Sequence, residues 1–404
     1  MPPKNSEKKE QNNMKNSAVI KRQKEKQTSN YNQFFATTFM GLEQVLAKEL
    51  MAIGAKDIKI ASRGVGFKGD LEIMYKANLW LRTAHRVLFQ IAEFDAADRD
   101  ALYKGVKAVN WGEHMTLEMT LAVDTVGTNA NLIHTQFTSR VVKDGVVDWF
   151  RERTGDRPSV DFKNPDLKLS AKISDDRCIL SWDTSGERLH QRGYRPGFGG
   201  PAPLKENLAA GLLLLSEFDG TDALIDPMCG SGTILIEGAL IAKNIAPGLL
   251  GRRFAFSRHK SFNMRMWANL QSDAKNEIRE IEGCPIIGFD ISGDAVRAAK
   301  TAATGAGVDD IIRIKRAPLK DLPTFKSGMV VTNPPYGERL GEINQLADLY
   351  TLLGDSLKHK CTGMSAHIIT ASKFLAGKVG LRTSRRDPVW NGPLECRLLH
   401  YDLY

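Results

Sequence analysis

The chain has 404 residues, of which 42% are hydrophobic and 25% charged, a composition typical of a globular protein with two or three domains. No apolar run approaches the roughly 18 residues of a membrane-spanning helix, and the first 30 residues lack the apolar segment of a signal peptide. Five scattered cysteines without a CxxC pair, and eight histidines without a ligand pattern, predict a cytoplasmic protein with no metal site.

The net charge of +9 is spread unevenly along the sequence. Residues 1–32 hold eight Lys or Arg against three Asp or Glu, residues 33–186 hold 20 against 21, and residues 187–404 hold 28 against 23. Basic excess fits a polyanionic partner, although it also serves solubility alone. Residues 1–32 have almost nothing to bury, so we expect a disordered basic tail, either passive or a phosphate-binding arm.

The segment after the tail is expected to form a compact α+β module, because short apolar runs alternate there with amphipathic stretches. In chain order, the patterns predict strands at 33–38, 58–60, 65–69, 117–123, 168–173 and 178–182, and helices at 42–53, 71–81, 101–109 and 136–153. The last two strands should form a hairpin. A segment rich in glycine and proline, residues 186–203, follows as a linker.

Basic side chains in the linker and in a later insertion, residues 246–283, are candidates for contacts with nucleic-acid phosphates. The candidates are Arg192, Arg195, Arg252, Arg253 and Lys260.

From residue 204 to residue 372, strand and helix patterns alternate, which predicts an α/β fold with a parallel, doubly wound sheet. Residues 381–399 should close this sheet as an antiparallel pair around Asn391-Gly392. In such sheets ligands bind at the carboxyl ends of the strands, so the residues that follow each apolar run are the candidate site.

The first candidate is the glycine loop from Asp226 to Thr233, which lies between a predicted strand and an apolar helix. It lacks the Gly-Lys-Ser/Thr of a phosphate loop, and Leu235 stands where a dinucleotide fingerprint has its third glycine. Asp226 followed by Gly230-x-Gly232 suits S-adenosylmethionine, because this cofactor has no pyrophosphate for the loop to bind. Asp226, Gly230 and Gly232 are therefore expected to bind this cofactor.

A second acid, Asp290, ends the next predicted strand and is expected to accept hydrogen bonds from the cofactor ribose. The usual spacing from the glycine loop is about 20 residues, and the insertion of residues 246–283 makes it far longer here. The alternative is that Asp290 only caps the helix that follows it.

The most specific motif is Asn333-Pro334-Pro335-Tyr336, which follows the apolar run Met329–Thr332. The Asn333 side-chain oxygen and the Pro334 carbonyl are both acceptors, so together they can hold the two hydrogens of an exocyclic base amine. The prolines make the loop rigid, and Tyr336 offers a ring for base stacking. Asn333, Pro334 and Tyr336 are the predicted catalytic residues; a proline-bracketed turn with a buried tyrosine is the alternative.

These motifs together resemble the bacterial large-subunit rRNA guanine methyltransferases of the THUMP class. The most similar stretches are Gly41-Leu42-Glu43, residues 64–70, residues 189–195, residues 226–233, residues 246–249 and residues 332–340. The resemblance implies a ferredoxin-like region over 33–72, a THUMP RNA-binding domain over 73–184 and a class I, Rossmann-like methyltransferase domain over 185–404. It also implies methyl transfer to the N2 amine of a guanine in 23S rRNA or in a large-subunit assembly intermediate.

The resemblance has two limits. Bifunctional family members carry a second methyltransferase domain that makes 7-methylguanine, and that activity is not expected of this sequence. Where the family has an acid after the third strand, this sequence reads Ile314-Lys315-Arg316, with Asp321 the nearest carboxylate, so the residue that contacts the cofactor adenine is not predicted.

Three alternatives to the guanine assignment stay open. The same loop occurs in enzymes that methylate adenine or cytosine amines in DNA, tRNA or protein. The chain could also be a non-catalytic RNA-binding assembly factor, or, as a distant third, a nicotinamide-dependent oxidoreductase. We expect a monomer with no membrane attachment.

Overall fold

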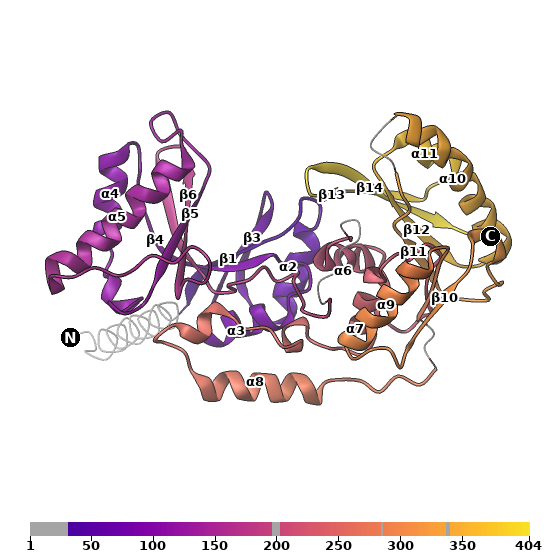
Figure 1. Ribbon diagram of the computed structural model, residues 1–404, viewed down its shortest axis with the longest axis horizontal. Helices are drawn as coiled ribbons and strands as arrows, with labels where there is room; N and C mark the ends of the chain where they lie inside the picture. Colours follow the sequence, from indigo (N-terminus) through magenta and orange to yellow (C-terminus); the bar gives the residue numbers. More distant parts are fainter. Residues whose placement is uncertain (1–30, 196–202, 284–285, 337–339) are drawn as a thin grey trace, which may run out of the picture.

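A computed structural model describes residues 31–195, 203–283, 286–336 and 340–404. Its strands form two seven-stranded sheets; the N-terminal sheet extends from one end to the middle of the molecule, and the C-terminal sheet lies in the other half (Figure 1). The tail predicted over residues 1–32 falls almost entirely outside the described residues. Across the described ranges, no helix combines the length and apolar character needed to cross a membrane.

The N-terminal sheet has the order β2-β3-β1-β4-β7-β6-β5, and in it only β5 and β6 pair in parallel. Its strands are β1 (Asn32–Thr37), β2 (Lys56–Ala61), β3 (Gly64–Gly69), β4 (Arg86–Asp95), β5 (Leu121–Val126), β6 (Leu167–Ser174) and β7 (Arg177–Asp183). Its helices are α2 (Glu43–Ala52), α3 (Leu71–Trp80), α4 (Arg99–Ala108) and α5 (Thr135–Thr154), with a 3₁₀ turn at Trp111–Glu113.

Two strands of this sheet correct the sequence-based expectation. β4 was not predicted, although it pairs with β1 on one side and β7 on the other and so makes one continuous sheet of residues 32–183. The strand expected at 117–123 is observed at Leu121–Val126, because the backbone N–H of Met119 closes a turn on Thr116 just before it. The predicted hairpin of β6 and β7 is confirmed.

One face of the N-terminal sheet forms the main core of this half. Side chains alternate along a strand, and in β1 Phe34 and Ala36 are buried while Phe35 and Thr37 are half-buried. Phe34 and Ala36 belong to a cluster that also contains Leu46 of α2 and Met74 of α3. Helices therefore cover one face, whereas on the other face the β1 side chains Phe35 and Thr37 are only partly buried.

The C-terminal sheet has the order β10-β9-β8-β11-β12-β14-β13. Its strands are β8 (Leu224–Asp226), β9 (Ile286–Asp290), β10 (Ile312–Arg316), β11 (Met329–Thr332), β12 (Ser365–Thr370), β13 (Arg385–Asn391) and β14 (Leu394–Asp402). The helices of this half are α6 (Glu206–Leu215), α7 (Thr233–Ala242), α8 (Met264–Asn276), α9 (Gly293–Gly305), α10 (Leu340–Lys360) and α11 (Lys373–Lys378), with 3₁₀ turns at Pro247–Leu249, Ala255–Arg258 and Leu319–Asp321.

The C-terminal sheet confirms the predicted doubly wound architecture. The first five strands of the sheet order are parallel, and β14 runs antiparallel to both β12 and β13. After β8 the chain builds outward to β9 and β10, then returns to the opposite side of β8 at β11. The topological switch point, where such sheets bind ligands, therefore lies between β8 and β11.

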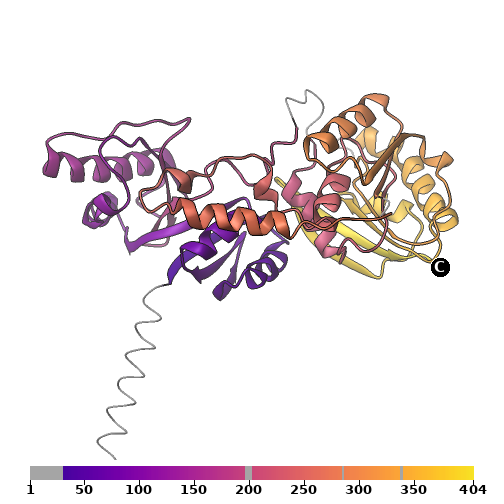
Figure 2. The same cartoon turned by 90° about the horizontal axis from the view of Figure 1, so that it is seen from below.

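The insertion of residues 246–283 leaves the C-terminal half and packs against the N-terminal half. Helix α8 lies alongside α3 in both views (Figures 1 and 2). The Asn263 backbone N–H donates to the Tyr75 hydroxyl at 2.9 Å. The centres of the Phe256 and Trp267 rings lie 4.7 and 5.8 Å from the centre of the Tyr75 ring. The insertion therefore contributes apolar side chains to the N-terminal core.

A second contact between the halves explains the motif Gly41-Leu42-Glu43. A Cβ on Gly41, whose φ is +89°, would lie only 2.1 Å from the Pro388 carbonyl oxygen of β13, so glycine permits this close approach. The Glu43 carboxylate accepts from the backbone N–H groups of Gly41 and Arg63 at 2.7 and 2.9 Å. This loop thereby holds the β13 strand against the N-terminal sheet.

Candidate active site

The glycine loop after β8 has a left-handed backbone at two positions. Gly230 has φ +53° and Gly232 has φ +77°, conformations that favour glycine. A Cβ at Gly232 would lie 2.9 Å from the Ala299 Cβ of α9, so this glycine also allows α7 and α9 to approach. At Gly230 a Cβ would meet no described atom within 4 Å apart from its chain neighbours. The backbone at Gly230 is therefore open to a ligand.

Asp290 ends β9 and holds the glycine loop from the side. Its Oδ2 accepts from the Gly230 backbone N–H at 2.9 Å, and its Oδ1 accepts from the Ser292 backbone N–H at 2.8 Å. Ser292, rather than Asp290, caps α9, because its hydroxyl accepts from the Ala295 N–H. The carboxylate remains half-buried and keeps further lone pairs for ligand hydroxyls.

Asp226 lies beneath the loop and is 1% exposed. Its Oδ1 accepts from the Met228 backbone N–H at 3.1 Å and from the Thr332 hydroxyl at 2.7 Å. The pKa of this carboxyl is raised to about 7, chiefly because the group is buried; the two hydrogen bonds lower it and the nearby charge of Asp290 adds to the rise, and the value of about 7 includes all of these effects. Asp226 therefore joins the glycine loop to the end of β11, and its contact with the cofactor stays a prediction.

Asn333 follows β11 directly, next to the switch point. Its Oδ1 is buried and has no hydrogen-bond partner among the described residues. An unmet buried acceptor is costly in a folded protein, so this oxygen is suited to a donor that arrives with a ligand. Pro334 is buried and Pro335 exposed, so the chain emerges toward solvent immediately after the first proline.

Tyr336 is fixed by contacts on both sides. Its hydroxyl accepts from the Asn391 side-chain amide at 2.9 Å, at the turn between β13 and β14. Its ring packs, half-buried, against the two apolar clusters of the C-terminal half. The ring is therefore held in place before any ligand binds.

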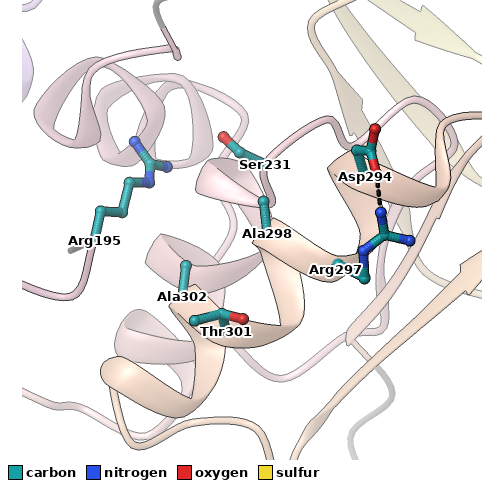
Figure 3. A pocket seen from close by; sticks show the side chains of 7 residues that line it. All are labelled: Arg195, Ser231, Asp294, Arg297, Ala298, Thr301 and Ala302. Carbon is teal, nitrogen blue, oxygen red and sulfur yellow. Dashed lines mark hydrogen bonds and ion pairs between the residues drawn. The ribbon is translucent and has the colours of Figure 1, made fainter. Parts of the chain in front are cut away.

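A cavity of about 270 Å³ lies beside the glycine loop, between Ser231 and α9 (Figure 3). Arg195 lines it from one side, and the ion pair of Asp294 and Arg297 lines it from the other. Arg195 also donates to the Thr233 hydroxyl at the start of α7 and pairs with Glu206 at 3.3 Å. Arg195 is thus placed at the cofactor loop.

The expectation that Arg192 contacts RNA is wrong for this structure, because its side chain is 1% exposed. Its guanidinium pairs with the fully buried Glu237 of α7 at 3.4 Å and donates to the carbonyls of Leu189 and Arg82. The Tyr194 hydroxyl lies 3.2 Å from the same glutamate. Arg192 therefore joins the linker to α7.

The other predicted RNA contacts lie on the insertion. Arg252 is partly buried and donates to the carbonyls of Glu187 and Arg188. Arg253 is exposed, and the exposed Lys260 donates to the Gly112 carbonyl. The hydrogen-bond partners of Arg252 and Lys260 therefore lie outside the glycine loop. Among the described residues, no group of three or more His, Cys, Asp or Glu side chains could hold a metal.

Comparison with known proteins agrees with this geometry. Residues 192–400 match the model of the "RMKL-like, methyltransferase domain" family, residues 33–88 match the "RlmL ferredoxin-like domain" and residues 96–183 match the THUMP domain. The first match covers more than half of the chain. The chain belongs to the RMKL-like methyltransferase family.

Relatives of this RMKL-like methyltransferase cover almost all of the sequence. It is 44% identical over 382 residues to the ribosomal RNA large subunit methyltransferase K/L of Syntrophotalea carbinolica, across 92% of this chain and 53% of the relative. The K/L protein of Methylococcus capsulatus is 41% identical over 377 residues, which cover 92% of this chain and 51% of that protein. The chain thus spans about half the length of these relatives.

Solved structures share the fold, and one of them contains the product form of the cofactor. A crystal structure described as a methyltransferase complexed with SAH (S-adenosylhomocysteine) matches with a TM-score of 0.84 and 30% identity, over 93% of this chain and 99% of that one. A Listeria monocytogenes protein described as a predicted N6-adenine-specific DNA methylase matches with a TM-score of 0.84 and 32% identity, over 94% and 98% of the two chains. S-adenosylmethionine is therefore the methyl donor of this family member.

The residues after β8 and β9 fit this donor. The loop at Gly230 offers open backbone, and the half-buried Asp290 beside it can accept from ribose hydroxyls. Sequence reasoning missed Thr332 and Glu237, which hold Asp226 and Arg192. Glu237 carries a signal that could have been used: it is the one charged residue in the apolar run Thr233–Ala242.

Proposed function

We propose that this RMKL-like methyltransferase transfers the methyl group of S-adenosylmethionine to the exocyclic N2 amine of a guanine in 23S rRNA. The family membership supports methyl transfer, and the names of the K/L relatives support large-subunit rRNA as the substrate. The THUMP match over residues 96–183 supports RNA as the polymer.

The observation that carries this proposal is the buried Oδ1 of Asn333, which lacks a partner among the described residues. The guanine amine has two hydrogens to donate, and this oxygen together with the Pro334 carbonyl would accept both. Holding the amine in this way turns its nitrogen lone pair toward the donor and away from conjugation with the ring. Most of the rate then comes from positioning and preorganised polar groups.

The remaining site residues have supporting roles. Gly230, Gly232 and Asp290 would hold the cofactor, which supplies an electrophilic methyl group on its sulfonium. Tyr336, already fixed through Asn391, would stack against a base that has been taken out of its helix. The new nitrogen–carbon bond forms as the sulfur–carbon bond breaks, and the amine then releases one proton to water.

Adenine is the second candidate target, because the Listeria protein is described as a predicted N6-adenine-specific DNA methylase. An adenine amine presents the same two hydrogens to Asn333 and Pro334. The two candidates differ in the product, so a direct product analysis separates them.

The test is mass-spectrometric mapping of 23S rRNA nucleosides from cells with and without this protein, with methyl transfer to that rRNA by the purified chain as confirmation. We expect one N2-methylguanosine to disappear in the deletion strain and to return with the wild-type protein. Loss of an N6-methyladenosine instead, or an unchanged nucleoside map, would refute the guanine assignment.

A further inference from the structure

A cleft of about 610 Å³ lies between the half-exposed face of the N-terminal sheet and the turn that joins β13 to β14. Phe35 and Thr37 of β1 line one wall, and Lys168 and Lys172 of β6 continue it. Trp390 and Gly392, at the turn between β13 and β14, also line it. None of these residues belongs to the cofactor loop.

The alternation of side chains along the strands places these lysines on the cleft face. In β6, Leu167, Leu169 and Ala171 are buried against the helical side, whereas Lys168 is half-buried and Lys172 exposed. A hydrophobic face would be expected to need a covering helix. In β6 this face instead carries two lysines four residues apart, Lys168 and Lys172, with Ser170 between them, so it can stay in contact with solvent and ions.

The cleft is strongly basic although residues 33–186 as a whole hold 20 basic against 21 acidic residues. Two carboxylates line it, Asp124 and Asp183. They face six cations, Arg63, Arg86, Lys168, Lys172, Arg188 and Lys205.

Ion pairing leaves most of that positive charge free. Asp183 pairs with Arg86, and Asp124 pairs with Lys168 at 2.6 Å. Within the described part of the chain, the other four cations have no carboxylate at ion-pair distance. His85, which also lines the cleft, has its pKa lowered to about 4 by burial and then by the charges of Lys205, Arg188 and Arg86.

Aromatic rings are interleaved with these cations. The Lys172 ammonium lies 5.5 Å from the centre of the Phe35 ring, and the Lys205 ammonium lies 5.5 Å from the centre of the Phe39 ring. Trp390, which also lines the cleft, is half-buried. Of these rings Phe39 is buried, whereas Phe35 and Trp390 are half-buried and so keep part of their surface accessible. Cations beside accessible aromatic surface are the combination with which proteins bind single-stranded nucleic acid.

The cleft is joined to the candidate active site through a single turn. Trp390 and Gly392 line the cleft, and Asn391 between them donates to the Tyr336 hydroxyl. The Trp390 backbone N–H donates to the Met40 carbonyl at 3.2 Å, which fixes this turn to the N-terminal half. A single-stranded nucleic acid lying in the cleft would therefore pass close to the Asn333–Tyr336 loop, which receives the target base.

We propose that this cleft binds the single-stranded RNA segment next to the target base, with phosphates on the four unpaired cations and a base stacked on Trp390. The inference rests on the proposed function for its substrate, but its site is separate from the residues that carry out methyl transfer. An acidic peptide would satisfy the cations and leave the aromatic faces unused, so RNA is the occupant that both features favour.

The test measures binding of a fluorescein-labelled single-stranded oligoribonucleotide of about 12 nucleotides to the full chain by anisotropy. The cleft variant is Lys172→Glu/Arg188→Glu. The control with the same charge change is Lys48→Glu/Lys104→Glu, because these lysines lie exposed on α2 and α4 on the helical side of the sheet.

We expect the cleft variant to bind at least tenfold more weakly, with a salt dependence reduced by about 1.4 logarithmic units per tenfold change in salt for two lost phosphate contacts. The control should stay within about twofold of wild type, and both variants should bind SAH normally. Trp390→Ala should weaken binding about fivefold or more while leaving the salt dependence unchanged.

Equal losses in the cleft and control variants would overturn the proposal, as would tighter binding of a duplex of the same length or equal competition by polyglutamate. These outcomes leave the methylation assignment intact, because it is judged from rRNA nucleosides. Conversely, an unchanged nucleoside map with cleft-dependent RNA binding would refute the proposed target and support the cleft.

Discussion

The two seven-stranded sheets of this protein use different parts of their geometry for function. In the C-terminal sheet the site residues follow the ends of β8, β9 and β11, and they meet because parallel strands end at one edge. In the N-terminal sheet the candidate RNA cleft lies on a face, built from alternate residues of several strands. Strand ends produce short sequence motifs, whereas a face gathers residues far apart in sequence. The comparison predicts that the two regions can be disabled separately.

The largest separable effect is expected at Asn333. Asn333→Ala removes one of two acceptors for the amine, and the loss of one preorganised polar contact of this type costs about 10²–10³ in rate. Methyl transfer should fall by that factor while SAH and RNA still bind, which calorimetry and anisotropy would check. Asn333→Asp keeps an acceptor and should retain part of the activity. Near-wild-type turnover by a folded Asn333→Ala protein would contradict the mechanism.

That prediction depends on residues that the sequence revealed well. Gly230, Asp290 and Asn333 became candidates because each lies at or just beyond the end of an apolar run. The structure confirms the strands: Asp290 ends β9, Asn333 directly follows β11, and Gly230 lies four residues after β8. Arg192 was misread because a basic residue in a glycine-rich linker looks exposed, and its partner Glu237 lies 45 residues later. Strand β4 was missed although it pairs with β1 on one side and with β7 on the other, and so makes the N-terminal sheet continuous. The cleft could not be predicted, because its lining runs from Phe35 to Gly392 and only the folded chain brings these residues together.

The second prediction concerns Asp226, beneath the C-terminal site. Because burial raises its pKa to about 7, above the usual value near 4, the protonated form is favoured by folding. The stability that it contributes is complete below about pH 4 and is lost as the pH rises through about 7. Asp226→Asn cannot ionise, so relative to wild type it should gain about 2 to 3 kcal/mol of unfolding free energy between pH 5 and pH 8.

Urea unfolding of both proteins at the two pH values measures this difference. The matched comparison is Glu206→Gln, measured by the same urea unfolding. Burial also raises the pKa of Glu206, but the charge of Arg195 offsets part of this rise. A constant gap between wild type and Asp226→Asn across this range would show that the carboxyl stays ionised in the folded protein.

The third prediction tests the cofactor loop alone. At Gly230 the backbone has φ +53° and faces open space, so Gly230→Val both strains the loop and fills the room that a ligand would need. SAH binding should weaken by at least tenfold, as measured by calorimetry, while RNA affinity stays at the wild-type value. Gly251→Val provides the control, because Gly251 also has positive φ and open surroundings but lies outside the loop. Equal SAH affinity for wild type and Gly230→Val would remove the loop from the cofactor site.

The smallest expected effect lies where the two regions meet. Tyr336→Phe keeps the ring for stacking and removes the hydroxyl that accepts from Asn391, a contact of about 1 kcal/mol. Methyl transfer should fall about fivefold through kcat, because the loop loses its tie to the β13–β14 turn, while SAH affinity is unchanged. Asn391→Ala should have a similar or smaller effect, and the double variant should be little worse than Tyr336→Phe alone. Both changes remove the Asn391–Tyr336 hydrogen bond, whereas Tyr336→Phe also removes the hydrogen bond of the Tyr336 side chain with Cys396. Independent, multiplying effects of the two changes would show that the turn and the loop act separately, and the RNA cleft would then have no route through Asn391 to the methyl-transfer site.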